Sequence, residues 1–225
     1  MRDAIQGGLG RSVAMVLAAV VLAAAPSALL RAEQDPQQVE IRNYEGERLG
    51  SVSSFPDNSI HGVQTIDAAS YRLAIDGLVA APAELSYGEL EAMSHIGKVV
   101  TILCVEMWSI KALWEGIPLA DLFSLVSPLP DANTVIFHAA DGYTTSLPLD
   151  VILGRHLIIA DHINGIVLPA ENGFPFQLVA EDKWGYKWIK WITRIELSSD
   201  PSYKGYWESR GYSNSGELSE PMFQQ

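Results

Sequence analysis

Cysteine is nearly absent from this chain of 225 residues, which contains only Cys104. One cysteine excludes an intramolecular disulfide, and alone it cannot build a zinc or iron–sulfur site from protein ligands. Because Cys104 follows the apolar run at residues 99–103, it stands at the end of a predicted buried strand. One interpretation is a packed core cysteine, since free cysteine is among the most buried residue types. The other is a thiolate that ligates a soft metal.

Common catalytic motifs are also missing. The sequence has no G-x-S-x-G elbow, no Walker A loop, no G-x-G-x-x-G after a strand and no H-E-x-x-H helix. The histidines are scattered, at His61, His95, His138, His156 and His162. The close pair His156 and His162 flanks Asp161, which indicates surface or loop polarity rather than a metal site. A hydrolase built from these histidines and acids is therefore the weakest of the functional interpretations.

Positive charge is scarce, with 15 basic against 27 acidic side chains and a formal net charge of −12. A surface this acidic argues against nucleic acid and against anionic lipid as partners. Hydrophobic residues make up 48 % of the chain, enough for one sizeable core and too many for a disordered chain.

The first 32 residues differ from the rest. Arg2 and Arg11 precede an uncharged, mostly apolar stretch at residues 13–25. This pattern predicts a signal peptide over residues 1–32, or a retained membrane anchor over residues 13–30. Either interpretation places the folded part in the periplasm or otherwise outside the cytoplasm. No twin-arginine pair precedes the apolar stretch.

Short strands dominate the predicted secondary structure. They are expected at residues 39–44, 71–75, 98–104, 134–139, 143–147, 157–160, 177–180 and 188–197. Asp141 and Gly142 between two of them predict a hairpin. A helix is expected from Ser86, which has capping-box spacing to Glu89, and another over residues 119–126 after Pro118. Without regular βαβ alternation, the fold class is mixed α+β with a largely β core and short helices.

A local excess of positive charge stands out near the C-terminus. Four basic side chains fall within twelve residues and alternate with aromatic ones: Lys183, Lys187, Lys190 and Arg194 with Trp184, Tyr186, Trp188 and Trp191. One interpretation is a solvent-exposed strand face beside an aromatic core cluster. The other is an anion pocket with flat walls, in which cations hold a phosphate and rings hold a planar heterocycle. The amide of Asn172 could donate and accept hydrogen bonds to such a ring.

Five motifs in order carry a resemblance to a known family. They are Cys104-Val105-Glu106-x-Trp108-Ser109, Trp114-x-Gly116-x-Pro118-Leu119, Asp141-Gly142-Tyr143, Asn172-Gly173-Phe174-Pro175 and Gly185-Tyr186-Lys187-Trp188-Ile189-Lys190. Together they resemble the molybdopterin domain of the sulfite oxidase family, above all the single-domain bacterial branch typified by the catalytic subunit of periplasmic methionine sulfoxide reductase. The resemblance implies a sulfite-oxidase-type molybdopterin oxidoreductase domain over residues 58–212, after an N-terminal extension at 33–57 and before a C-terminal tail at 213–225.

The resemblance also implies a function. Cys104 would be the catalytic residue and the protein's ligand to molybdenum, or to tungsten in a variant, held by molybdopterin. The other residues implied to bind the cofactor are Asn58, His61, Asn172, Trp188, Ile189 and Lys190. The enzyme would transfer an oxygen atom to or from a small-molecule substrate. It would exchange electrons with a separate partner, either a membrane cytochrome or a soluble carrier.

Departures from the family pattern favour an alternative. Gln177 stands where the bacterial branch has an arginine on the cofactor, and Met107 replaces a small residue, which predicts a narrower pocket. Only Lys98 and Lys111 are basic near Cys104, so sulfite is not expected as a substrate. Gln177 and the missing twin-arginine pair motivate the alternative function, a cofactor-free binding or scaffold module that retains the same fold.

Overall fold

The computed structural model describes residues 39–224. The predicted signal peptide or anchor, and the start of the predicted extension, lie outside the described residues. From residue 39 onward, no helix has the length and hydropathy needed to cross a bilayer.

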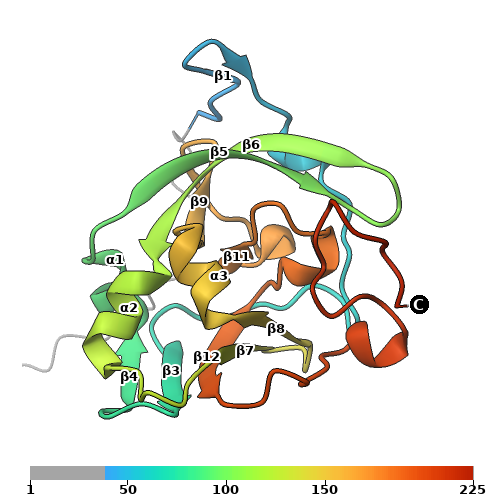
Figure 1. The fold of residues 1–225 in the computed structure, drawn as a ribbon. Helices are drawn as coiled ribbons and strands as arrows, with labels where there is room; N and C mark the ends of the chain where they lie inside the picture. Colours follow the sequence, from blue (N-terminus) through green and yellow to red (C-terminus); the bar gives the residue numbers. More distant parts are fainter. Residues whose placement is uncertain (1–38, 225) are drawn as a thin grey trace, which may run out of the picture.

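Two five-stranded sheets form most of the domain (Figure 1). In the first sheet the order is β10-β9-β6-β5, with β11 also paired to β9, and all pairings are antiparallel. Its strands are β5 (Ile96–Leu103), β6 (Ser109–Pro118), β9 (Ile158–Ile163), β10 (Ile166–Val167) and β11 (Gln177–Val179).

The second sheet has the order β4-β3-β12-β7-β8, in which only the β12–β3 pairing is parallel. Its strands are β3 (Arg72–Gly77), β4 (Ala83–Ser86), β7 (Thr134–Ala139), β8 (Thr144–Pro148) and β12 (Ile192–Ser198). A separate small hairpin pairs β1 (Asn43–Tyr44) with β2 (Glu47–Arg48). The predicted fold class, a mixed domain with a largely β core, is confirmed.

The helices are short. They are α1 (Tyr87–Glu91), α2 (Leu119–Val126) and α3 (Leu149–Gly154), with 3-10 turns η1 (Val52–Ser54), η2 (Ala170–Asn172), η3 (Gly185–Lys187) and η4 (Glu208–Arg210). The predicted capping box begins α1, since Ser86 Oγ accepts from the backbone N–H of Glu89 and the Glu89 carboxylate accepts from that of Ser86. Helix α2 follows Pro118 as predicted and buries its apolar face in the core.

Two predicted strand boundaries were wrong. Of residues 39–44, only the last two pair as a strand. The strand predicted from residue 188 begins at Ile192, because Trp191 adopts a left-handed conformation with φ of 52°. Strand β6 and helix α3 were not predicted. In β6, a β carbon at Gly116 would lie 2.1 Å from the carbonyl oxygen of Ile159, so the absence of a side chain lets β6 approach β9.

The segment predicted as a C-terminal tail packs against the domain. The backbone N–H of Trp184 donates to Gly216 at 2.8 Å, and that of Leu218 donates to Asp182 at 2.9 Å. This part of the chain, red in Figure 1, therefore lies beside the segment that follows β11.

Candidate functional site

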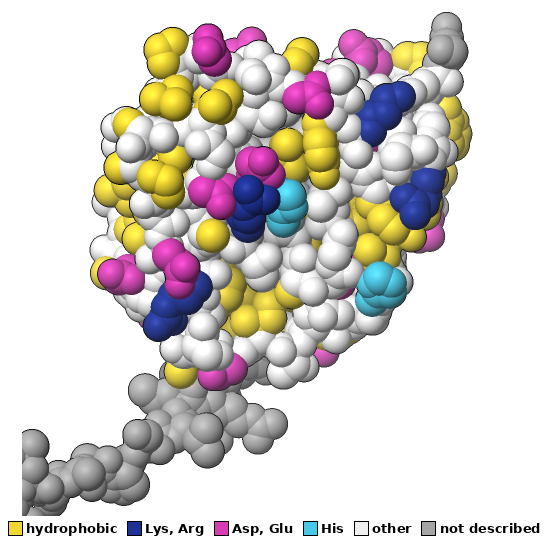
Figure 2. Space-filling model, turned by 90° about the horizontal axis from the view of Figure 1, so that it is seen from below, with side chains coloured by type: hydrophobic (Ala, Val, Ile, Leu, Met, Phe, Trp, Pro, Cys, Tyr) yellow, Lys and Arg dark blue, Asp and Glu magenta, His cyan; other side chains and the backbone are white. Residues whose placement is uncertain are grey.

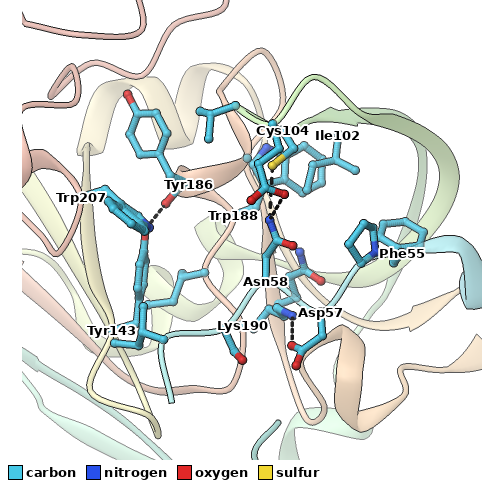
Figure 3. Close-up of a pocket in the computed structure, with 18 of the residues that line it drawn as sticks. Phe55, Asp57, Asn58, Ile102, Cys104, Tyr143, Tyr186, Trp188, Lys190 and Trp207 are labelled. Atoms are coloured by element: carbon cyan, nitrogen blue, oxygen red, sulfur yellow. Dashed lines mark hydrogen bonds and ion pairs between the residues drawn. The ribbon is translucent and has the colours of Figure 1, made fainter. Parts of the chain in front are cut away.

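A pocket of about 360 Å³ lies where the β5–β6 turn meets segments from both ends of the domain (Figure 3). Its walls come from residues 55–60, from the turn at residues 102–108 and from residues 185–191, with single residues from other loops. The volume falls within the range of roughly 300–1,000 Å³ that is typical of small-molecule sites.

Cys104 opens the turn between β5 and β6, so the predicted place at a strand end is confirmed. Its backbone N–H donates to Trp108 at 2.9 Å, and its carbonyl accepts from Met107 at 3.0 Å. Met107 adopts a positive φ of 66°, which lets the chain reverse within five residues. The cysteine is 5 % exposed and lines the pocket, where Asn58 Nδ2 donates to its sulfur at 3.4 Å.

Burial raises the pKa of the Cys104 thiol, and the nearby Glu106 carboxylate raises it further. The backbone N–H groups of Glu106 and Val105 and the Asn58 amide oppose this by hydrogen bonding to sulfur. The net shift is upward, so the thiol keeps its proton at neutral pH. A bound metal cation would displace that proton, because metal coordination deprotonates a thiol outright.

Lys190 is the only cationic side chain among the pocket-lining residues of the described chain. Its Nζ donates to the Glu171 carbonyl at 2.8 Å and lies 3.7 Å from an Asp57 carboxylate oxygen. It also lies 4.8 Å from the centroid of the Trp191 ring. Burial lowers the pKa of Lys190, while Asp57 opposes the shift. The ammonium group is thus held at the wall of the pocket.

Two glycines allow the walls of the pocket to approach each other. At Gly173, with φ of 105°, a β carbon would lie 2.9 Å from Cβ of Lys190. At Gly185, a β carbon would lie 3.2 Å from Cα of Cys104. A side chain at either position would therefore push apart segments that carry predicted cofactor contacts.

The structure brings most of the predicted site residues together. The pocket is lined by Asn58, Cys104, Asn172, Trp188, Ile189 and Lys190. His61 is exposed and does not line it; its Nδ1 lies 2.7 Å from the carbonyl oxygen of Asp141, which does. Gln177 is buried and also faces the pocket. The binding roles of these residues stay predictions.

The interpretation of four cations as an anion pocket was wrong for three of them. Lys187, Lys183 and Arg194 lie outside the pocket and pair with acids: with Glu208 at 2.5 Å, Glu217 at 2.5 Å and Asp76 at 2.8 Å. The alternative, a solvent-exposed strand face, was also wrong, because Lys183 and Lys187 are buried. On the face shown in Figure 2, several basic side chains likewise stand beside acidic ones.

Three other basic or bulky residues do not reach the pocket. Met107 is 76 % exposed and absent from the lining, so the prediction that it narrows the pocket was wrong. Lys98 pairs with Glu181, and Lys111 pairs with Glu47 at 2.7 Å.

Sequence reasoning missed Phe55, Asp57, Trp207 and Tyr212, which also line the pocket. They lie on loops far from Cys104 in sequence, so no local pattern links them to it. The one signal was aromatic density, since Trp207 and Tyr212 belong to a cluster of rings in edge-on and tilted contact near the C-terminus.

The donor set fits a cofactor that brings its own metal ligands. Within residues 39–224, no group of three or more His, Cys, Asp or Glu could hold a metal ion. A metal at Cys104 would therefore take its remaining ligands from an organic group. Trp108 lines the pocket, and its Nε1 is buried with no hydrogen-bond partner in the described structure, which leaves a donor for a bound group. Fold and site together fit a domain that binds such a cofactor.

Comparison with known proteins supports a cofactor-binding domain. Residues 60–207 match the family model described as the oxidoreductase molybdopterin binding domain. The chain belongs to this family, and it is accordingly a molybdopterin-binding oxidoreductase domain.

Curated relatives share about a third of their residues with the chain. A protein of Azospira oryzae, provisionally named the protein-methionine-sulfoxide reductase subunit YedZ1, is 37 % identical over 70 % of this chain and 61 % of its own length. The uncharacterized oxidoreductase YuiH of Bacillus subtilis is 32 % identical over 67 % of this chain and 76 % of its own. The protein-methionine-sulfoxide reductase catalytic subunit MsrP of Gluconobacter oxydans is 35 % identical over 60 % of this chain and 49 % of its own length. The chain thus spans between half and three quarters of these relatives.

Among solved structures, the sulfane dehydrogenase SoxCD from Paracoccus pantotrophus has the same fold. It aligns with a TM-score of 0.60 and 21 % identity, covering 62 % of this chain and 41 % of that one. This supports the sulfite-oxidase-type architecture predicted from the sequence.

Proposed function

We propose that this protein is an extracytoplasmic molybdopterin enzyme that reduces a small sulfoxide, with Cys104 as the protein ligand to the metal. The single observation that carries the proposal is a lone, buried thiol at the wall of a pocket that also gathers Asn58, Asn172 and Lys190. Two relatives whose names refer to methionine sulfoxide reduction support the choice of substrate.

The bound cofactor would supply a metal that exchanges an oxygen atom and two electrons. Reducing a sulfoxide to a thioether consumes two electrons and two protons and releases one water. Asn58 holds the cysteine in place, since its amide donates to Cys104 Sγ at 3.4 Å and to Glu106 Oε2 at 3.3 Å. The aromatic walls, including Trp188 and Tyr186, exclude water and offer an apolar surface to the substrate.

The charges of the pocket favour a neutral substrate over an anion. Among the described residues, the lining has three carboxylates, Asp57, Glu106 and Asp141, and one cation, Lys190. Lys190 is predicted to hold the cofactor's phosphate, so an oxyanion such as sulfite would meet the carboxylates without a free cation, and like charges repel each other in a poorly solvated site. A sulfoxide carries a strong dipole and no net charge.

Electrons would come from a separate membrane cytochrome or soluble carrier. The sequence contains no haem or flavin motif, and two of the relatives are named as subunits. The location outside the cytoplasm rests on the basic and apolar pattern of residues 1–32.

Elemental analysis for molybdenum and tungsten, on protein purified from its native host, tests the proposal. About one metal per chain, together with reduction of methionine sulfoxide by a dye-based electron donor, is the expected result. Cys104→Ala should lose its metal. Met107→Ala, a change at an exposed residue of the same turn, is the matched control and should keep its metal. Metal-free wild-type protein would instead support the alternative, a binding module without cofactor, which the uncharged Gln177 in the pocket favours.

A further inference from the structure

A buried ion pair lies behind the pocket wall and takes no part in the proposed chemistry. The side chains of Lys187 and Glu208 are both 0 % exposed, and Lys187 Nζ lies 2.5 Å from Glu208 Oε1. Lys187 also donates to the Ser146 carbonyl at 3.0 Å, and Thr145 Oγ1 donates to the same Glu208 oxygen at 2.5 Å. The pair therefore joins three segments: η3, η4 and β8.

Each of these segments carries or adjoins pocket-lining residues. Lys187 lies between Tyr186 and Trp188, Glu208 follows Trp207, and Tyr143 directly precedes β8. Turn η3 also begins at Gly185, whose backbone abuts Cys104. Any displacement of Lys187 is thus transmitted to the surface that faces the thiol.

The pair is costly to bury, so it is weak evidence for stability. Burial lowers the pKa of Lys187, and Glu208 opposes that shift. Glu208 Oε2 is buried without a partner in the described structure, which leaves half of the carboxylate unsatisfied. Apolar side chains of similar volume often replace such a pair without loss of stability. What they cannot replace is the set of directed hydrogen bonds to Ser146 and from Thr145.

We propose that Lys187 and Glu208 are positioning residues, which fix the η3 wall of the pocket against Cys104 so that the site is preformed for its cofactor. This inference rests on the proposed function for the identity of the bound group, but the geometry that it explains belongs to the protein alone. It can therefore be tested on the cofactor-free chain.

The test compares Lys187→Met/Glu208→Met with the wild type, both as the full chain made without cofactor. The double variant leaves no unpaired buried charge, so its melting temperature should stay within a few degrees of the wild type. The rate at which iodoacetamide alkylates Cys104 should nevertheless rise at least about fivefold, because a loosened wall opens more often. Asp76→Asn, which breaks a half-buried ion pair on the second sheet, is the control and should label at the wild-type rate.

Wild-type labelling in a folded double variant would overturn the proposal. If that variant does not fold, Thr145→Val decides, since it removes one hydrogen bond to Glu208 and keeps the ion pair. It should also label faster, and an unchanged rate would count against the proposal. In a host that makes the cofactor, the double variant should carry at least about fivefold less molybdenum than the wild type. Metal-free wild-type protein would refute the proposed function, while the labelling rates would still decide the positioning role.

Discussion

Asn58 Nδ2 lies 3.4 Å from the sulfur of Cys104, although 46 positions separate the two residues in the chain. The same amide nitrogen lies 3.3 Å from Glu106 Oε2. One amide group thus links the predicted metal ligand to a carboxylate of the same turn, and it does so from a loop that belongs to neither sheet.

Replacing Asn58 by alanine should slow catalysis more than it empties the site. The sulfur and the Glu106 carboxylate would both lose their shared donor, and groups that orient a ligand typically contribute 10- to 100-fold. We expect a rate of sulfoxide reduction at least about tenfold lower at a metal content near that of the wild type. Gln64→Ala removes another amide from the same segment, whose hydrogen bonds stay local, and should have no effect. An unchanged rate in Asn58→Ala would contradict the orienting role.

Cys104→Ala should remove the metal. The described residues offer no other cluster of metal ligands, so nothing would replace the thiolate. Elemental analysis should show at least about a tenfold loss of molybdenum per chain, with the circular dichroism spectrum of the folded domain retained. Full metal content together with full activity in this variant would show that the thiol is only a packed core residue.

Lys190→Met should weaken retention of the cofactor. Lys190 is the one cation that the described residues contribute to the pocket lining, and it is predicted to hold the cofactor's phosphate. A charge-assisted hydrogen bond contributes about 1.5–3 kcal/mol. Dialysis of loaded protein should then release metal about tenfold more readily than from the wild type. Lys204→Met, at an exposed lysine that bonds Gln224, serves as the control. Equal retention in both variants would exclude a phosphate role for Lys190.

Protonation of His162 should stabilise the fold. The carboxylate of Asp161 is fully buried and lies 3.0 Å from His162 Nδ1, and this hydrogen bond raises the histidine pKa. Because the folded-state pKa exceeds the unfolded value of about 6.5, the stabilisation is complete below that pH and is lost as pH rises through the folded-state pKa.

Denaturant unfolding at a series of pH values measures this effect. His162→Gln should flatten the dependence of the free energy of unfolding on pH in that window. His156→Gln, at an exposed histidine, is the control variant. A wild-type slope in His162→Gln would assign the effect to another group.

Local sequence patterns were sufficient for elements whose signals lie within a few residues. The capping box at Ser86 and Glu89 and the apolar face of α2 each predicted their element correctly. Strand β6 escaped prediction because Lys111, Glu115 and Gly116 interrupt its alternation. Its pairing depends instead on the two neighbours β5 and β9, and no periodicity reports that.

For the functional site, too, the sequence predicted some features correctly and missed those that depend on distant contacts. The family resemblance assigned Asn58, Cys104 and Lys190 to one cofactor site, and the structure places all three at one pocket. The run of basic residues misled because its partners are distant: Glu208 lies 21 residues from Lys187, and Asp76 lies 118 from Arg194. Sequence shows where charges are dense, and only the tertiary fold shows which of them are neutralised.

The turn that carries Cys104 closes the β5–β6 hairpin, a contact between sequence neighbours of the kind that forms rapidly. The rest of the pocket comes from residues 55–60 on one side and residues 185–212 on the other. In a nascent chain that still lacks residue 212, the pocket around the Cys104 thiol is therefore incomplete. Binding of the cofactor at Cys104 would in consequence need the finished domain, because the walls of the pocket come from both ends of the described chain.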